Sequence, residues 1–191
     1  MTYLIAGIAF FVGVHSVRLV APAWRERFIS THGATTWKLV YTLLSLGGLA
    51  LMIYGFSLSR ADPVFLWNPP PWTRHVALPL TLIAMILFAA SGGPPNLIKH
   101  KLGHPMFAGV KVWAFAHLLA NGRLGDVLLF GTLLVWAIAG FAISRRRDRR
   151  NHVHYPAGAP RATLITVIMG LAVWALITFW LHRVVIGVPP I

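Results

Sequence analysis

Apolar residues gather along this chain into six long runs, and polar or basic residues fill the stretches between them. A helix of roughly 20 apolar residues spans the hydrocarbon core of a bilayer. The strict apolar–polar alternation of a membrane β-barrel is absent from the sequence. The pattern therefore predicts an all-α integral membrane bundle of about six transmembrane helices, in a single domain over residues 1–191. The predicted helices cover residues 3–21, 37–58, 76–91, 105–120, 125–143 and 163–186.

The number of complete spans stays open at this stage. Runs 76–91 and 105–120 are short for a bilayer, so a five-helix bundle with one re-entrant segment is the alternative. The first run ends near Ala21-Pro22-Ala23, which resembles a signal-peptide cleavage site. No basic residue precedes that run, and His15 and Arg18 interrupt it, so we interpret it as a retained first helix.

Composition agrees with a membrane protein. The chain has 191 residues, of which 57% are hydrophobic and 11% charged, whereas soluble domains carry about 25% charged residues. The formal net charge is +13, which we assign to loops facing an anionic lipid leaflet. A nucleic-acid partner is not expected, because no platform of interleaved aromatic and basic residues is present. Without cysteine, thiolate ligands and covalent haem attachment are excluded, and the nine histidines are the candidate metal ligands.

Basic residues alternate between the loops and so predict an orientation. Eleven lie in or beside loops 22–36, 92–104 and 144–162, and four lie on the opposite side. The positive-inside rule places the first group in the cytoplasm. The sequence therefore predicts a multi-pass protein of the cell inner membrane with both termini outside the cytoplasm.

Loop 59–75 is rich in proline and tryptophan. Three consecutive prolines favour a stiff extended segment, and Trp67 and Trp72 suit a membrane interface. An interfacial loop is one interpretation, and a lid over a site that opens outward is the other.

Of the ionisable residues inside the predicted helices, four are the candidates that matter here: His15, Arg18, Lys111 and His117. Such residues cost roughly 2.5 kcal/mol or more in the hydrocarbon and are candidates for a functional site. His15 and Arg18 are three residues apart, which places them on one helix face. His104, which begins the fourth helix, and His117 are separated by about 20 Å of helical rise and cannot bind one metal atom.

Depth in the membrane suggests another pairing. With the first and fourth helices antiparallel, His15 and His117 are offset by roughly 12 Å along the membrane normal. That offset allows two imidazoles to flank one haem iron, with Arg18 and Lys111 as cations for the propionates. A tetrahedral zinc site is less suitable, because its ligands must come closer together. The alternative is that both histidines bond to neighbours and Lys111 reaches the interface.

Four stretches carry a family resemblance. GVHSVR (13–18), GHPMFAGVKVWAFAHLLANG (103–122), LFG (129–131) and RRRDRR (145–150) resemble the NnrU family of bacterial membrane proteins, across about 150 residues. The resemblance implies a role in denitrification and nitric oxide reductase function. Trp113 and Asn121, which flank His117 in this pattern, and His104 are secondary candidates for the site.

The same fold family includes the 15-cis-zeta-carotene isomerase, a membrane enzyme that uses haem b. Its haem histidines lie in an HS motif and a WC-x-AH motif, which match His15 and His117 here. This resemblance implies haem b as the cofactor. Ala114 stands where the isomerase has a cysteine, which puts isomerase-type ligand switching in doubt. Asp148 resembles part of a DRR ending shared with the isomerase and is interpreted here as part of a cytoplasmic basic anchor.

Several functions stay open. The first is a haem-binding membrane protein that supports nitrogen oxide metabolism or an isomerase-like redox reaction on a hydrophobic small molecule. The second is a non-catalytic assembly or maturation factor for a respiratory reductase. HPMFAG (104–109) is only loosely similar to a segment of membrane methyltransferases, and a transporter is disfavoured because no inverted repeat is visible. Whether the protein is an enzyme is not decided by its sequence.

Overall fold

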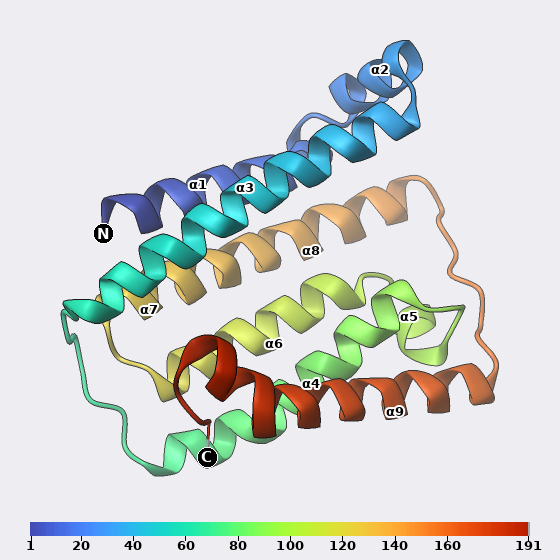
Figure 1. The fold of residues 1–191 in the computed structure, drawn as a ribbon. Helices are drawn as coiled ribbons and strands as arrows, with labels where there is room; N and C mark the ends of the chain where they lie inside the picture. The colour runs from blue at the N-terminus through green and yellow to red at the C-terminus, as the bar shows by residue number, and fades with distance from the viewer. Residues whose placement is uncertain (191) are drawn as a thin grey trace. The chain divides into compact units, whose positions relative to one another are not determined.

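The computed structural model describes residues 1–190, and helices form most of them (Figure 1). The all-α fold class is confirmed. Five helical stretches are long and apolar enough to cross a membrane, and the remaining predicted helix, 105–120, forms α6, which is shorter at 16 residues. The five stretches are Thr2–Val20, Ala34–Ala61, Trp72–Gly92, Leu124–Arg150 and Pro160–Ile186.

The described chain divides into two compact units. The first unit comprises Met1–Trp67 and Arg123–Thr132, and the second comprises Asn68–Gly122 and Leu133–Ile191. A single transmembrane domain over the whole chain stays a prediction. The elements of the first unit are α1 (Thr2–Val20), α2 (Pro22–His32), α3 (Ala34–Ala61), α7 (Leu124–Asp126) and the π-helix η1 (Val127–Gly131).

Glycines bring α1 and α3 of the first unit into close contact, and the two helices run side by side in Figure 1. A Cβ atom at Gly7 would lie 2.5 Å from the backbone nitrogen of Met52, and one at Gly55 would overlap the backbone of Leu4. Small residues allow this backbone approach, which is how helices associate in lipid, where no hydrophobic force drives them together. The α1–α3 pair is therefore held by backbone-to-backbone packing.

The second unit consists of the remaining helices. They are α4 (Trp72–Gly92), α5 (Leu97–Leu102), α6 (Pro105–Ala120), most of α8 (Thr132–Arg150), α9 (Pro160–Leu176) and the π-helix η2 (Ile177–Ile186). Helix α4 packs against both α6 and α9. Gly170 of α9 meets the backbone of Ile86, and Gly109 of α6 meets the ring of Phe88. Glycine thus again marks where the helices approach most closely.

Three predicted loops contain helix. Segments 22–36 and 92–104 were expected to be loops, but they form α2 and α5, and α8 continues to Arg150 through the basic run. Pro22 stands in the first turn of α2, where its missing N–H costs nothing. Asn96 caps α5 by accepting a hydrogen bond from the Lys99 N–H at 2.8 Å. These helices are polar or basic, so the search for apolar runs did not find them.

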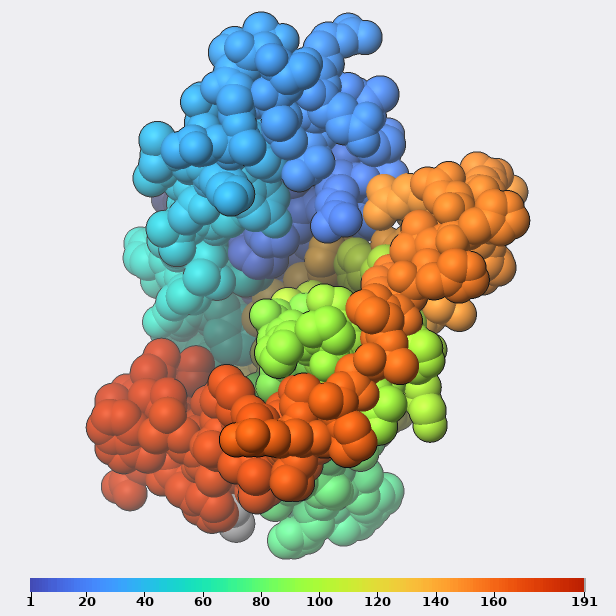
Figure 2. Space-filling view, turned by 90° about the vertical axis from the view of Figure 1, so that its right-hand side faces the viewer, coloured from blue at the N-terminus to red at the C-terminus, as the bar shows by residue number. Residues whose placement is uncertain are grey.

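The connection 151–159 lies against α5 in the second unit, as the orange and green segments show in Figure 2. The ring Nδ1 of His100 hydrogen-bonds to the Tyr155 carbonyl at 2.6 Å. A Cβ atom at Gly158 would overlap the backbone of Pro95 and Asn96. The connection is thus fixed to the end of the unit where α6 begins and α8 ends.

Candidate functional site

His117 lies on the last turn of α6 and is half-buried. Its ring Nδ1 donates a hydrogen bond to the Trp113 carbonyl at 2.8 Å, and the Trp113 ring lies 4.6 Å away, centroid to centroid. The Asn121 amide donates to the His117 carbonyl at 2.8 Å. Because a carbonyl can only accept, Nδ1 carries the proton, and Nε2 is the nitrogen with the lone pair in the neutral ring. The structure thus brings His117, Trp113 and Asn121 together.

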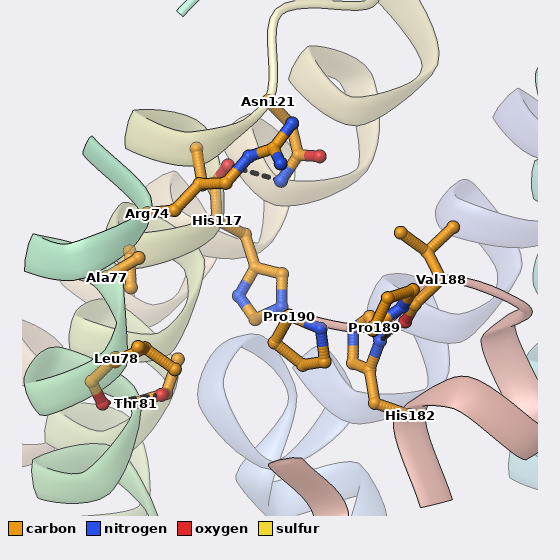
Figure 3. A pocket seen from close by; sticks show the side chains of 12 residues that line it. Arg74, Ala77, Leu78, Thr81, His117, Asn121, His182, Val188, Pro189 and Pro190 are labelled. Carbon is orange, nitrogen blue, oxygen red and sulfur yellow. Dashed lines mark hydrogen bonds between the residues drawn. The ribbon is translucent and has the colours of Figure 1, made fainter. Parts of the chain in front are cut away.

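A cavity of about 130 Å³ lies beside His117 within the second unit (Figure 3). Helix α4 contributes Arg74 and Thr81, and η2 contributes His182. Figure 3 shows the His117 ring pointing toward the side where Pro190 lies. The remaining lining residues are Ala77, Leu78, Ala116, Ala120, Asn121, Val188 and Pro189. The cavity therefore combines small apolar walls with one guanidinium and two imidazoles.

His15 lies on α1 in the first unit with a similar local arrangement. Its Nδ1 donates to the Phe11 carbonyl at 2.8 Å, and its ring stacks on Phe11 at 4.0 Å between centroids. The rings of His15 and of Tyr41 on α3 pack edge to face, with 5.3 Å between their centroids. Arg18 follows one turn later and is exposed. His15 is therefore also held with its Nε2 as the lone-pair nitrogen of the neutral ring.

The two histidines share a pattern of an aromatic residue four positions earlier. The carbonyl of that residue accepts the Nδ1 hydrogen bond, and its ring lies against the imidazole. His32 on α2 repeats this pattern, with 3.3 Å between its Nδ1 and the Phe28 carbonyl oxygen. His32 is exposed, however, and lies outside the spanning helices. Since His15 and His117 lie in different units, their joint binding of one iron stays a prediction.

Lys111 lies over an aromatic ring. Its Nζ is 3.9 Å from the centroid of Phe141 on α8, and the side chain is half-buried. A cation held over an aromatic face is stabilised by roughly 0.5–2 kcal/mol. The predicted binding of Lys111 and Arg18 to haem propionates stays a prediction.

His104 forms a polar cluster with two residues far along the chain. Its Nε2 lies 2.7 Å from Asp148 Oδ2, and the Tyr155 hydroxyl donates to the same oxygen at 2.9 Å. Asp148 is buried at the last turns of α8. This carboxylate, interpreted from sequence only as part of a basic anchor, therefore has a specific partner. We call His104, Asp148 and Tyr155 the polar cluster.

A comparison with protein families decides the assignment. The model of the family described as "NnrU protein" matches residues 3–190. This chain belongs to the NnrU family. The family name links it to nitric oxide reductase gene clusters. No curated protein and no solved structure matches the chain.

Two residues of the NnrU cavity were missed by reasoning from sequence. Arg74 was counted only as a loop charge, and His182 was not considered although it falls inside an apolar segment. An imidazole in such a segment is itself a signal of a functional site. His182 lies in the π-helical η2, so a 3.6-residue period would not have placed it on the correct face.

Within residues 1–190 of the NnrU chain, no group of three or more histidine or carboxylate side chains is arranged to hold a metal ion. A closed tetrahedral zinc site needs four protein ligands. Haem iron needs only one or two axial ligands, because the macrocycle supplies four.

Proposed function

We propose that this NnrU protein binds haem b in the membrane and supports nitrogen oxide metabolism, with His15 and His117 as axial ligands to the iron. The family's link to nitric oxide reductase gene clusters supports the process. The positions of the two histidines on helices expected to lie in the membrane support the cofactor, since an imidazole there is expensive unless it has a task.

The observation that carries the proposal is the Nδ1 hydrogen bond of each ring. His15 and His117 each donate Nδ1–H to a backbone carbonyl at 2.8 Å. Histidines that ligate metals almost always donate their other ring N–H to a carbonyl or carboxylate, which fixes the tautomer and raises the basicity of the ligating nitrogen. These Nδ1 bonds assign Nε2 of each ring as the atom that would ligate the iron.

Nearby side chains supply the remaining features of such a site. When bound, haem b supplies an iron that changes oxidation state and binds small molecules. Arg18, one turn after His15, and Lys111, on the helix of His117, provide positive charge for the two propionates. Ala114 is fully buried and carries no thiol. In this proposal only imidazoles ligate the iron, and no cysteine at position 114 can replace a histidine ligand.

The proposal includes the orientation of the protein in the inner membrane. The polar cluster and the basic end of α8 face the cytoplasm, and both termini lie outside. Alkaline phosphatase fused to the C-terminus should therefore be active, because it folds outside the cytoplasm. Green fluorescent protein fused to the same end should be dark, because it does not become fluorescent after Sec-dependent export. The reverse pair of results would contradict this orientation.

Removing Nε2 from either histidine should remove the haem. Asparagine places its amide near the position of Nδ1, so His15→Asn and His117→Asn retain a donor for the carbonyl and lose the ligand atom. We expect each variant, purified in detergent from haem-supplied cells, to lose most of the Soret absorbance of the wild-type protein. His32→Asn is the matched control, because His32 has the same local arrangement outside the spanning helices.

The outcomes separate the proposed function from its main alternative. Equal Soret absorbance in His15→Asn, His117→Asn and His32→Asn would show that these histidines do not hold the haem. A colourless wild-type protein that co-purifies with a respiratory reductase, and whose loss lowers reductase activity, would instead support an assembly or maturation factor.

A further inference from the structure

The cavity beside His117 is lined by the guanidinium of Arg74, which carries a permanent positive charge. Arg74 lines it from the first turn of α4, and His182 lines it from η2. Asp148 is the one acidic side chain among the described residues of the second unit. It is engaged in the polar cluster where α6 begins, whereas the cavity lies where α6 ends. Arg74 therefore has no acidic side chain within its own unit at this end.

We propose that this cavity binds a small anion, either an oxyanion of the size of nitrite or a short carboxylate. The guanidinium of Arg74 presents a planar fork of N–H donors, which matches two oxygens of such an anion. The orientation proposed above makes the cavity accessible from outside the cytoplasm, but the binding chemistry does not depend on that orientation.

His182 is held so that one ring nitrogen is left for a ligand. Its Nδ1 donates to the Val188 carbonyl, and this bond also holds the segment that carries Pro189 and Pro190 against the cavity. Nε2 is the other ring nitrogen, and it donates to an anion when it carries a proton. Asn121 has a second amide hydrogen besides the one bonded to the His117 carbonyl. Arg74, Asn121 and His182 line one cavity in Figure 3 and together form a donor set for an anion.

The size of the cavity limits its occupant. Its volume of about 130 Å³ is close to that of a protein cavity that accepts benzene. Part of the cavity wall consists of the short side chains of Ala77, Ala116 and Ala120, and Ala116 is fully buried. An anion of the size of nitrite or acetate fits in this volume. The ligand class is therefore set by both charge and volume.

Isothermal titration calorimetry of the full-length protein in a neutral detergent tests the site, with sodium nitrite and sodium acetate as probes at constant chloride concentration. We expect saturable binding of at least one probe. Arg74→Gln and His182→Asn should each weaken it about tenfold or more, as loss of a charge-assisted hydrogen bond does. The matched controls are the sequence neighbours His75→Asn and Arg183→Gln, both exposed and outside the cavity lining.

Two results would overturn the proposal. One is the absence of saturable binding of either probe to the wild-type protein. The other is equal affinity of the Arg74→Gln and Arg183→Gln variants, since both lose one positive charge but only Arg74 lines the cavity. If Arg74→Gln does not fold, Ala120→Leu serves instead, because a leucine would fill the cavity and should also reduce the affinity.

Loss of anion binding and loss of haem binding can be distinguished by experiment. None of the three anion-binding residues is a proposed iron ligand. His15 belongs to the first unit and does not line the cavity, so His15→Asn should lose the Soret absorbance and keep the affinity for the anion. Loss of anion binding in this variant would contradict a cavity that works within the second unit alone.

Discussion

The variant Gly55→Ala should separate α1 from α3 and lower the free energy of unfolding of the protein by about 1–3 kcal/mol, the usual cost of overpacking. The added Cβ atom would overlap the backbone of Leu4 and Tyr3. Backbone atoms cannot move aside as a flexible side chain can, so one helix must shift away from the other. Reversible unfolding in mixed micelles, followed by circular dichroism, measures the change.

Gly47 provides a matched control on the same helix. A Cβ atom at Gly47 would have no heavy atom within 4 Å. Alanine is favoured over glycine inside a helix by roughly 0.5–1 kcal/mol, so Gly47→Ala should raise the stability slightly while Gly55→Ala lowers it. Two changes of the same sign and size would show that the close approach at Gly55 does not exist in the protein.

Replacing Asp148 by alanine should lower the free energy of unfolding by about 3 kcal/mol, because the polar cluster would lose its acceptor. Nε2 of His104 and the hydroxyl of Tyr155 both bond to one oxygen of this carboxylate, at 2.7 and 2.9 Å. His104 is the N-cap residue of α6, Asp148 lies in the last turn of α8, and Tyr155 lies in the following connection. The substitution therefore releases three segments of the second unit at once.

A graded series isolates the role of Asp148. Tyr155→Phe removes one of the two donors and should cost about 1 kcal/mol. Arg149→Ala, an exposed neighbour in the same basic run, should change the stability by less than about 0.5 kcal/mol. If Asp148→Ala were no less stable than Arg149→Ala, Asp148 would be only part of a basic anchor, as its sequence context suggested.

Long apolar runs made most of the fold predictable from the sequence. Each of the six predicted ranges overlaps an observed helix, since hydropathy over about 20 residues directly reflects burial in lipid. Helix α2 escaped detection because none of its 11 residues is buried in the described structure and no apolar stripe marks it. Helix α5 escaped because it has only 6 residues and follows a Pro-rich turn.

The candidate site was predictable only in part. His15 and His117 stood out because an imidazole within an apolar run is costly. The partners of His104 lie 44 and 51 residues away, and no local pattern connects them. The same holds for Lys111 and Phe141, and for the C-terminal segment that lines the cavity with His182. Contacts between distant segments depend on how the helices pack, which periodicity does not specify.

The two ends of the second unit differ in their chemistry. The polar cluster fixes the end where α6 begins, and it engages the unit's one acidic side chain among the described residues. The other end carries His117 beside a cavity with Arg74 and His182. A structural role at one end and ligand chemistry at the other explain why ionisable residues stand at both ends of this short helix, His104 at its N-cap and His117 in its last turn.

An absorption spectrum of the wild-type protein tests the haem proposal most directly. The protein should be purified in neutral detergent from cells supplied with haem precursor, and its spectrum recorded oxidised and after reduction with dithionite. We expect a Soret band that changes on reduction and a pyridine haemochrome of haem b at about one per chain. A folded, colourless protein that takes up no added haemin would contradict it.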